Sequence, residues 1–285
     1  MRNGRLNWTG VVRPLPERLG WPLKWEKPRR IFVCNESDLF HEAVPVRFAA
    51  EVFNTMASDR LRCRKKECEH DEEECYQDPG HTYQILTKRA ERMLELLRPG
   101  GKLEDDVFSY WPGDSPISIA MEYGDWPLLN VWLGVSVEDQ KTADERIPLL
   151  LQTPAAVRFV SYEPALVPVD FAPWLLANGN STGDRKGLDW IIAGGESGPN
   201  ARPCEVRWIR AVRDHCQAAG VPFFFKQWGQ WCPESQLSQE IFVQSVHGGV
   251  GSKYQADETH HRVGKKAAGR LLDGREWNEF PNVGT

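Results

Sequence analysis

Residues 190–198 read Trp190-Ile191-Ile192-Ala193-Gly194-Gly195-Glu196-Ser197-Gly198. An apolar run that ends in glycines and a carboxylate is typical of a buried strand whose carboxyl end opens into a loop. Five other apolar runs end in polar or ionisable residues in the same way, at 31–33, 83–86, 131–135, 157–160 and 221–225. Helical patterns separate most of these runs. Strands that alternate with helices predict parallel pairing and right-handed crossovers.

The six units predict an α/β fold, namely a parallel β/α barrel or partial barrel of the TIM-like kind. Near-continuous apolar strands indicate one curved sheet that is covered on both faces. We divide the chain into an N-terminal extension (1–30), a barrel domain (31–232) with a Cys-bearing insert at 59–80, and a C-terminal extension (233–285). Segment 99–129 is rich in Gly, Pro and Asp and is predicted to be a long surface loop.

Composition excludes several classes of protein. Of the 285 residues, 41% are hydrophobic and 26% are charged, which is ordinary for a folded soluble protein and excludes global disorder. No apolar run is long enough for a transmembrane helix, and residues 1–30 do not resemble a signal peptide. The seven Cys therefore predict a reduced, cytoplasmic setting without membrane contact. A net charge of −5 argues against a uniformly basic coat for nucleic acid.

The ends of the predicted strands carry the residues most suited to chemistry. Carboxyl ends of parallel strands meet at one edge of the sheet, where such folds bind ligands. We therefore predict a small-molecule site at the barrel mouth, although strand ends are also polar simply because loops begin there. The expected ligand-binding residues are Asn35, Asp38, Lys88, Arg89, Ser136, Ser161, Gly194, Gly195, Glu196, Ser197 and Gln227. The expected catalytic residues are Glu138, Glu163 and Lys226, as acid–base groups or as contacts to hydroxyl and anionic groups.

Gly194-Gly195-Glu196 is the sharpest of these features. Two glycines let a ligand approach the backbone closely, and the carboxylate can bind an ammonium group or a ribose hydroxyl. Turns also use glycine for its backbone freedom alone. The chain has no phosphate-binding Gly-Lys-Ser/Thr loop and no Gly-x-Gly-x-x-Gly pattern, which disfavours a nucleoside triphosphatase and a Rossmann dehydrogenase.

Two further segments each leave two interpretations open. Cys63, Cys68, His70 and Cys75 suit a tetrahedral zinc site, although their spacing matches no standard finger and a solvated charged loop is the alternative. If they bind zinc, their donor atoms should converge within about 4 Å of one another. Segment 262–275 is basic and could contact a phosphate backbone or form a solvated face, through Arg262, Lys265, Lys266, Arg270 and Arg275.

A set of ordered motifs resembles one known family. They are Leu86-Thr87-Lys88-Arg89, Trp132-Leu133-Gly134-Val135-Ser136-Val137-Glu138-Asp139-Gln140, Phe159-Val160-Ser161-Tyr162-Glu163-Pro164, Gly194-Gly195-Glu196-Ser197-Gly198, Pro222-Phe223-Phe224-Phe225-Lys226-Gln227-Trp228-Gly229 and Gly264-Lys265-Lys266-Ala267-Ala268-Gly269-Arg270-Leu271-Leu272-Asp273-Gly274. Over about residues 8–280, the chain resembles the phage-associated "Gp thirty-seven/Gp sixty-eight" family of unknown function. The resemblance implies the barrel of radical S-adenosylmethionine enzymes, with a three-Cys motif that holds a [4Fe–4S] cluster.

The chain departs from that family in its cysteines. The family's three-Cys motif lies upstream of Asn7-Trp8-Thr9-Gly10, near a first strand, and this sequence lacks it. Cys34 is the only thiol expected at a strand end, and one thiolate cannot hold a cluster that takes three or more protein ligands. We therefore expect a barrel without its first strand and without a cluster, as a truncated product or a clusterless remnant.

Three functions remain open from the sequence. The first is a radical-S-adenosylmethionine-like scaffold whose strand ends bind cofactor or substrate without the radical step. The second is a non-catalytic module that binds nucleic acid or a protein partner and carries zinc in its insert. The third is a metal-dependent hydrolase, with a divalent ion among Asp38, Glu138, Glu163 and Glu196.

Overall fold

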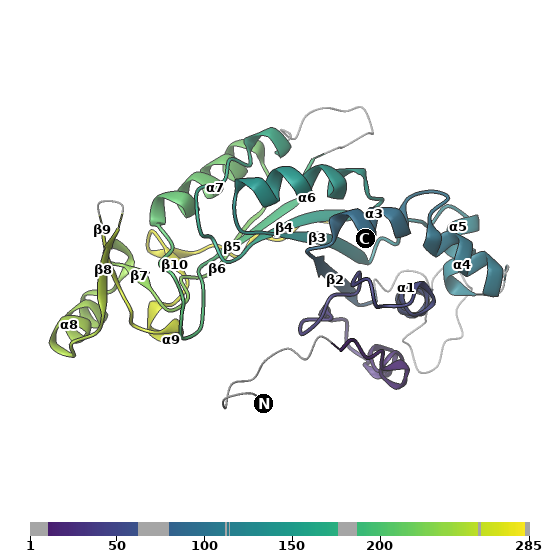
Figure 1. Cartoon of the computed structure of the whole chain (residues 1–285), viewed down its shortest axis with the longest axis horizontal. Helices are drawn as coiled ribbons and strands as arrows, with labels where there is room; N and C mark the ends of the chain where they lie inside the picture. The colour runs from purple at the N-terminus through teal and green to yellow at the C-terminus, as the bar shows by residue number, and fades with distance from the viewer. Residues whose placement is uncertain are drawn as a thin grey trace.

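A six-stranded parallel sheet forms the centre of the molecule. The computed structural model describes residues 11–61, 80–111, 113, 115–175, 187–255 and 258–282. The strands are neighbours in chain order: β1 (Arg30–Val33), β2 (Thr82–Thr87), β3 (Val131–Val137), β4 (Val157–Tyr162), β5 (Trp190–Gly194) and β6 (Phe223–Gln227). The sheet curls into a half-barrel with helices on its outer side (Figure 1). The predicted parallel partial barrel is therefore confirmed.

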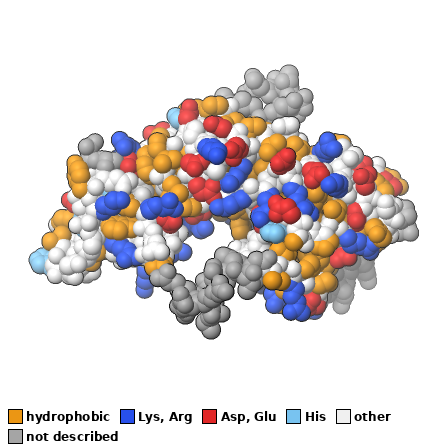
Figure 2. All heavy atoms as spheres, viewed as in Figure 1, with side chains coloured by type: hydrophobic (Ala, Val, Ile, Leu, Met, Phe, Trp, Pro, Cys, Tyr) orange, Lys and Arg blue, Asp and Glu red, His pale blue; other side chains and the backbone are white. Residues whose placement is uncertain are grey.

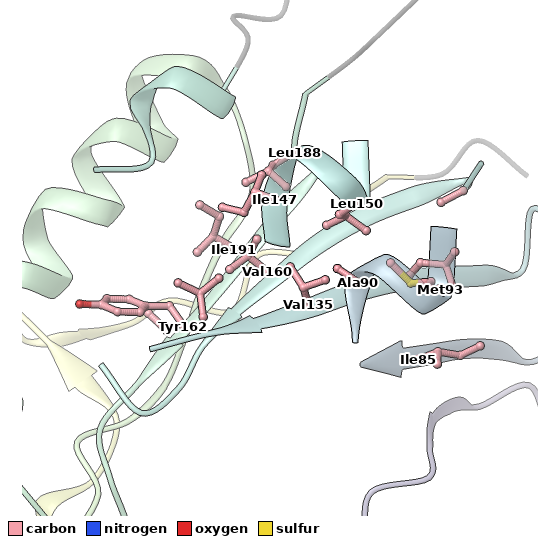
Figure 3. Close-up of a cluster of buried hydrophobic side chains, with 14 of the residues drawn as sticks. Ile85, Ala90, Met93, Val135, Ile147, Leu150, Val160, Tyr162, Leu188 and Ile191 are labelled. Carbon is pink, nitrogen blue, oxygen red and sulfur yellow. The ribbon is translucent and has the colours of Figure 1, made fainter. Parts of the chain in front are cut away.

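The helices cover one face of this sheet. They are α1 (Val46–Leu61), α3 (Ala90–Leu97), α4 (Lys102–Tyr110), α5 (Pro116–Glu122), α6 (Gln140–Gln152) and α7 (Val206–Ala219), with short 3₁₀ helices at Pro16–Arg18, Pro22–Lys24 and Ala172–Trp174. Apolar side chains of neighbouring strands point toward α3 and α6 in Figure 3, where Ile85, Val135, Val160 and Ile191 meet Met93, Ile147 and Leu150. Among the described helices, none is long and apolar enough to cross a bilayer.

The prediction of a surface loop over 99–129 is wrong, because α4 and α5 lie within it. Leu103, Val107 and Ile117 are fully buried, so each helix docks through an apolar face. Ser115 caps α5 with a capping box, in which its hydroxyl accepts from the backbone N–H of Ser118. Tertiary packing of a few apolar residues stabilises these two helices, although the composition of the segment is typical of a loop.

The concave face of the sheet has its own aromatic core. Trp132, Phe159 and Trp190 are buried there and pack with one another. At Gly134, an added Cβ would lie 2.5 Å from the Phe159 ring, so the glycine lets this ring lie across β3. Farther along the same face, Phe32 of β1 is 45% exposed, so the core does not fill the half-barrel.

The C-terminal part begins with a small antiparallel sheet. Its strands lie in the order β7 (Cys232–Pro233), β9 (Glu258–His261), β8 (Ser252–Gln255), beside a 3₁₀ helix at Glu234–Gln236 and α8 (Gln239–His247). The chain continues through α9 (Lys265–Ala268), β10 (Leu271–Leu272) and β11 (Arg275–Glu276). In Figure 1, β7–β9 and α8 lie at the end of the molecule opposite α4 and α5.

The last described residues return to the half-barrel. The N–H of Phe225 in β6 donates to the carbonyl of Trp277 (3.0 Å), which covers part of the edge of β6. Phe280 packs on the concave aromatic core, and the guanidinium of Arg30 in β1 lies 3.8 Å from the centre of its ring. Phe280 thus contacts both the middle strands and the first strand, and it covers the base of the half-barrel.

Candidate functional site

The alternation of side chains divides the strand ends between two sides of the sheet. Along each strand, every second side chain points to the same face as Trp132, Phe159 and Trp190 of the concave core. The side chains between them point to the helices. We use the term concave row for the polar residues that follow the concave core: Lys88, Ser136, Glu138, Ser161, Glu163, Gly194 and Lys226. In the view of Figure 1 and Figure 2, an open space lies below the sheet, between the part that carries β6 and α9 and the part that carries β2 and α1.

Glu138 is the centre of the first half of the concave row. The ammonium group of Lys88 contacts its carboxylate directly, and Arg146 of α6 donates to its Oε2 at 3.1 Å. Arg146 also donates to the carbonyl of Ser136 (2.7 Å), which fixes the guanidinium against the end of β3. The Glu138 side chain is 13% exposed and that of Lys88 is 58% exposed. The carboxylate is therefore held in place, while the ammonium group is free to move.

Glu163 has the same relation to Lys226. Lys226 Nζ donates to Glu163 Oε2 at 3.0 Å, and the Ser161 hydroxyl donates to the same oxygen at 3.2 Å. The carboxylate is again largely buried and the lysine half exposed. At Gly194, an added Cβ would lie 2.6 Å from Glu163 Oε1, so the glycine leaves room for this carboxylate.

The two ion pairs lie at one edge of the sheet. β3 and β4 are neighbours, with Ser136 opposite Ser161, and adjacent strands lie about 4.8 Å apart. Glu138 and Glu163 are the next residues on the concave side of these two strands. The concave row therefore presents two largely buried carboxylates on neighbouring strands, each paired with an exposed lysine.

Asp38 and Arg89 lie in a separate cluster. The Asp38 carboxylate accepts from the hydroxyl of Thr87 (2.8 Å), the backbone N–H of Phe40 (2.9 Å) and Arg89 Nη1 (2.9 Å). Thr87 is in register with Val135, on the helix side of the sheet. Arg89 also pairs with Glu42 (3.0 Å). The structure therefore joins Asp38 to Arg89, and the backbone N–H of Lys88, a residue of the concave row, also donates to Asp38 Oδ2 at 3.3 Å. Asn35 is exposed in the turn after β1.

Gly195 and Glu196 contact the chain's own loop after β6. An added Cβ at Gly195 would lie 1.9 Å from the carbonyl oxygen of Trp228, so the close approach here is made by the backbone. The side-chain hydrogen bonds from Arg202 lower the pKa of Glu196. Gln227 donates to the Ser197 hydroxyl at 3.2 Å. A ligand-binding role for these residues stays a prediction.

The described cysteines do not fit a [4Fe–4S] cluster. Cys204, Cys216 and Cys232 are fully buried. Burial raises the pKa of Cys34 and Cys204, and raises that of Cys216 and Cys232 to about 12, which opposes the thiolate form that ligates iron. Across the described residues, no three His, Cys, Asp or Glu are arranged to hold a metal ion. The candidate zinc ligands Cys63, Cys68, His70 and Cys75 lie outside those residues.

The basic segment 262–275 is not one uniform face. Arg270 lies over the Phe224 ring at 4.9 Å and Arg275 over the Trp277 ring at 3.6 Å, so both pack on the returning C-terminal residues. Arg262 donates to the carbonyl of Pro199. Lys265 and Lys266 are exposed on α9. A nucleic acid or protein partner for this segment stays a prediction.

The sequence does not predict two arginines that contact these sites. Arg146 reaches Glu138 from the second turn of α6, and Arg202 reaches Glu196 from the following loop. Capping of α6 by Asp139 places Arg146 beside β3, but no sequence pattern distinguishes it from the other charged residues of that helix.

Comparison with known proteins gives one result. No curated protein and no solved structure matches the chain. The family model described as "Protein of unknown function (DUF5131)" matches residues 2–62 and 72–281, nearly the whole sequence. The chain therefore belongs to the DUF5131 family of proteins of unknown function.

Proposed function

We propose that the concave row binds a small zwitterionic ligand of the amino-acid type, and that it does so without an iron–sulfur cluster on the described cysteines. The observation that carries this proposal is the pair of largely buried carboxylates, Glu138 and Glu163, each paired with an exposed lysine at one sheet edge. S-adenosylmethionine is the specific ligand that the family resemblance implies.

Binding of a zwitterion would exchange ion pairs without leaving a charge unpaired. The ligand's ammonium group would take the place of a lysine beside Glu138 or Glu163, and its carboxylate would pair with the displaced lysine. Lys88 and Lys226 are more than half exposed, so they can move at small cost, whereas the carboxylates are fixed by Arg146 and Ser161. A ligand with a single charge would leave one partner uncompensated, which is unfavourable at a partly buried site.

The adjoining concave face supplies an apolar wall. Leu86 and Ile192 are half-buried on it, and Phe32 is 45% exposed. Small-molecule sites are commonly lined by apolar and aromatic side chains with a few polar groups that set orientation. These residues would contact the apolar or heterocyclic part of the ligand, while the ion pairs orient its zwitterionic end.

The metal-dependent hydrolase is less well supported. Asp38 lies on the helix side of the sheet, apart from Glu138 and Glu163. Asp38, Glu138, Glu163 and Glu196 are all already paired with a cation, so a divalent ion would have to displace several of them.

The proposal is tested by calorimetric titration of the chain with S-adenosylmethionine and with methionine. We expect both to bind, and N-acetylmethionine, which lacks the ammonium group, to bind at least about tenfold more weakly. Glu163→Gln and Lys226→Met should each weaken binding by a similar factor, whereas Lys141→Met, at an exposed ion pair on α6, should leave it unchanged. Absence of binding by the unmodified chain, or equal binding of N-acetylmethionine, would overturn the proposal.

A further inference from the structure

A pocket lies in the C-terminal part, away from the concave row. It has a volume of about 500 Å³, within the range of small-molecule sites. It lies between the 3₁₀ helix at Glu234–Gln236, α8 and the strands β8 and β9. The residues that line it are Glu234, Ser235, Leu237, Gln239, Phe242, Tyr254, Glu258 and Thr259.

The lining combines two carboxylates with apolar and aromatic surface. No lysine or arginine is among the described residues that line the pocket. Glu258 uses Oε1 to accept from the backbone N–H of Ser235 (2.8 Å), and Glu234 Oε2 lies 3.1 Å from His261 Nε2. Within the described part of the chain, the second oxygen of each carboxylate has no hydrogen-bond partner. The pocket therefore offers two acceptor oxygens and no cation of its own.

A buried hydrogen-bond chain fixes one wall of the pocket. His261 Nδ1 lies 3.2 Å from the Ser245 hydroxyl, which donates to the carbonyl of Phe242 at 2.8 Å. The Phe242 and His261 rings meet edge to face at 5.6 Å. Ser245 is 3% exposed, so this Ser-His-Glu arrangement presents no nucleophile to solvent and instead holds Glu234 and Phe242 in position.

We propose that this pocket binds an organic cation, namely an amidinium, guanidinium or ammonium group on an apolar or aromatic body. The cation would pair with the free oxygens of Glu234 and Glu258, and the rest of the ligand would contact Phe242, Leu237 and the face of Tyr254. Tyr254 is 71% exposed at the pocket, so its ring is uncovered and available to stack on a cation. An anionic ligand would meet two carboxylates and no compensating charge.

The test uses two probes of the same shape, benzamidine, which is a cation, and benzamide, which is neutral. Titration followed by protein NMR should show saturable binding of benzamidine, with shifts at the pocket residues, and binding of benzamide at least about tenfold weaker. Glu258→Gln and Tyr254→Ala should each weaken the binding of benzamidine. Glu240→Gln, on α8 but outside the pocket lining, is the control and should not.

The outcomes separate this inference from the proposed function. Lys226→Met in the concave row should leave benzamidine binding unchanged, because the two sites share no residue. No binding of benzamidine at about 10 mM, equal binding of benzamide, or unchanged binding by Glu258→Gln and Tyr254→Ala would each overturn the proposal. A folded far-ultraviolet spectrum for each variant excludes unfolding as the reason for lost binding.

Discussion

The Asp38 cluster and the Glu163–Lys226 pair of the concave row lie at the same sheet edge, but they differ in what holds each carboxylate. Asp38 is held by the hydroxyl of Thr87, the backbone N–H of Phe40 and Arg89, all within 2.9 Å. Glu163 is held by one hydroxyl and by a lysine whose side chain is 53% exposed. Under the proposed function, a small ligand would displace the exposed lysine of Glu163 and not the donors that surround Asp38.

The donors that hold a carboxylate distinguish structural residues from binding residues better than the residue type does. Carboxylates that accept from the backbone and from an anchored arginine stabilise the loop that carries them. Exposed lysine–carboxylate pairs contribute little to stability, because solvent screens them and the lysine loses entropy. We therefore expect changes at the Asp38 cluster to alter mainly stability, and changes at the Glu163–Lys226 pair to alter mainly binding.

The largest expected effect distinguishes two neighbouring glycines. Gly195→Ala should lower the free energy of unfolding by about 3 kcal/mol or more, because its Cβ would lie 1.9 Å from the backbone carbonyl of Trp228. Gly194→Ala would displace only the end of the Glu163 side chain. It should lower the free energy of unfolding far less, but it should weaken ligand binding. Urea unfolding of both variants measures this, and equal losses would contradict the distinction.

The next effect is at Asp38. Asp38→Ala removes the acceptor of four donors and should lower the free energy of unfolding by about 2 kcal/mol. Asp144→Ala, on the exposed face of α6, removes only one side-chain contact to Gln140 and should change it by less than about 0.5 kcal/mol. Denaturant unfolding monitored by tryptophan fluorescence compares the two. A loss at Asp38 as small as that at Asp144 would show that this cluster is not structural.

A third prediction concerns pH. Hydrogen bonds from Arg210 and Arg213 lower the pKa of Asp273 to about 2 from its ordinary 3.8. Because the folded-state pKa is depressed, this carboxylate stabilises the fold above about pH 4, and the stabilisation is lost as pH falls toward 2. Asp273→Asn should remove about 1 kcal/mol at pH 6, after allowance for solvent screening. The difference between the two proteins should shrink from pH 5 to pH 2 in thermal unfolding; a constant difference would contradict the assignment.

The smallest expected effect on stability is in the concave row itself. Lys226→Met should change the free energy of unfolding by less than about 0.5 kcal/mol, because the lysine is exposed and its ion pair is screened. The same variant should lose ligand affinity. A large loss of stability would place Lys226 with the structural residues and remove the contrast with Asp38.

The sequence predicts the sheet better than it predicts the site. The strands were found because each is a nearly continuous apolar run that ends in polar residues. α4 and α5 were missed because a few buried residues such as Leu103 and Ile117 decide them within a segment of loop-like composition. The separation of Asp38 from Glu138 and Glu163 depends on strand register, since a shift of one residue moves a side chain to the other face. Register is set by packing between strands, so no single sequence motif predicts it.

The measurement that tests the central claim most directly is amide hydrogen exchange of the chain with and without S-adenosylmethionine, with N-acetylmethionine as the control. We predict that S-adenosylmethionine slows exchange at the carboxyl ends of β3, β4 and β5 and in the residues after β6, around Glu138, Glu163 and Lys226. At the same ligand concentration, below saturation, Lys226→Met should reduce this protection. No protection at these strand ends, or protection equal with N-acetylmethionine, would contradict the account.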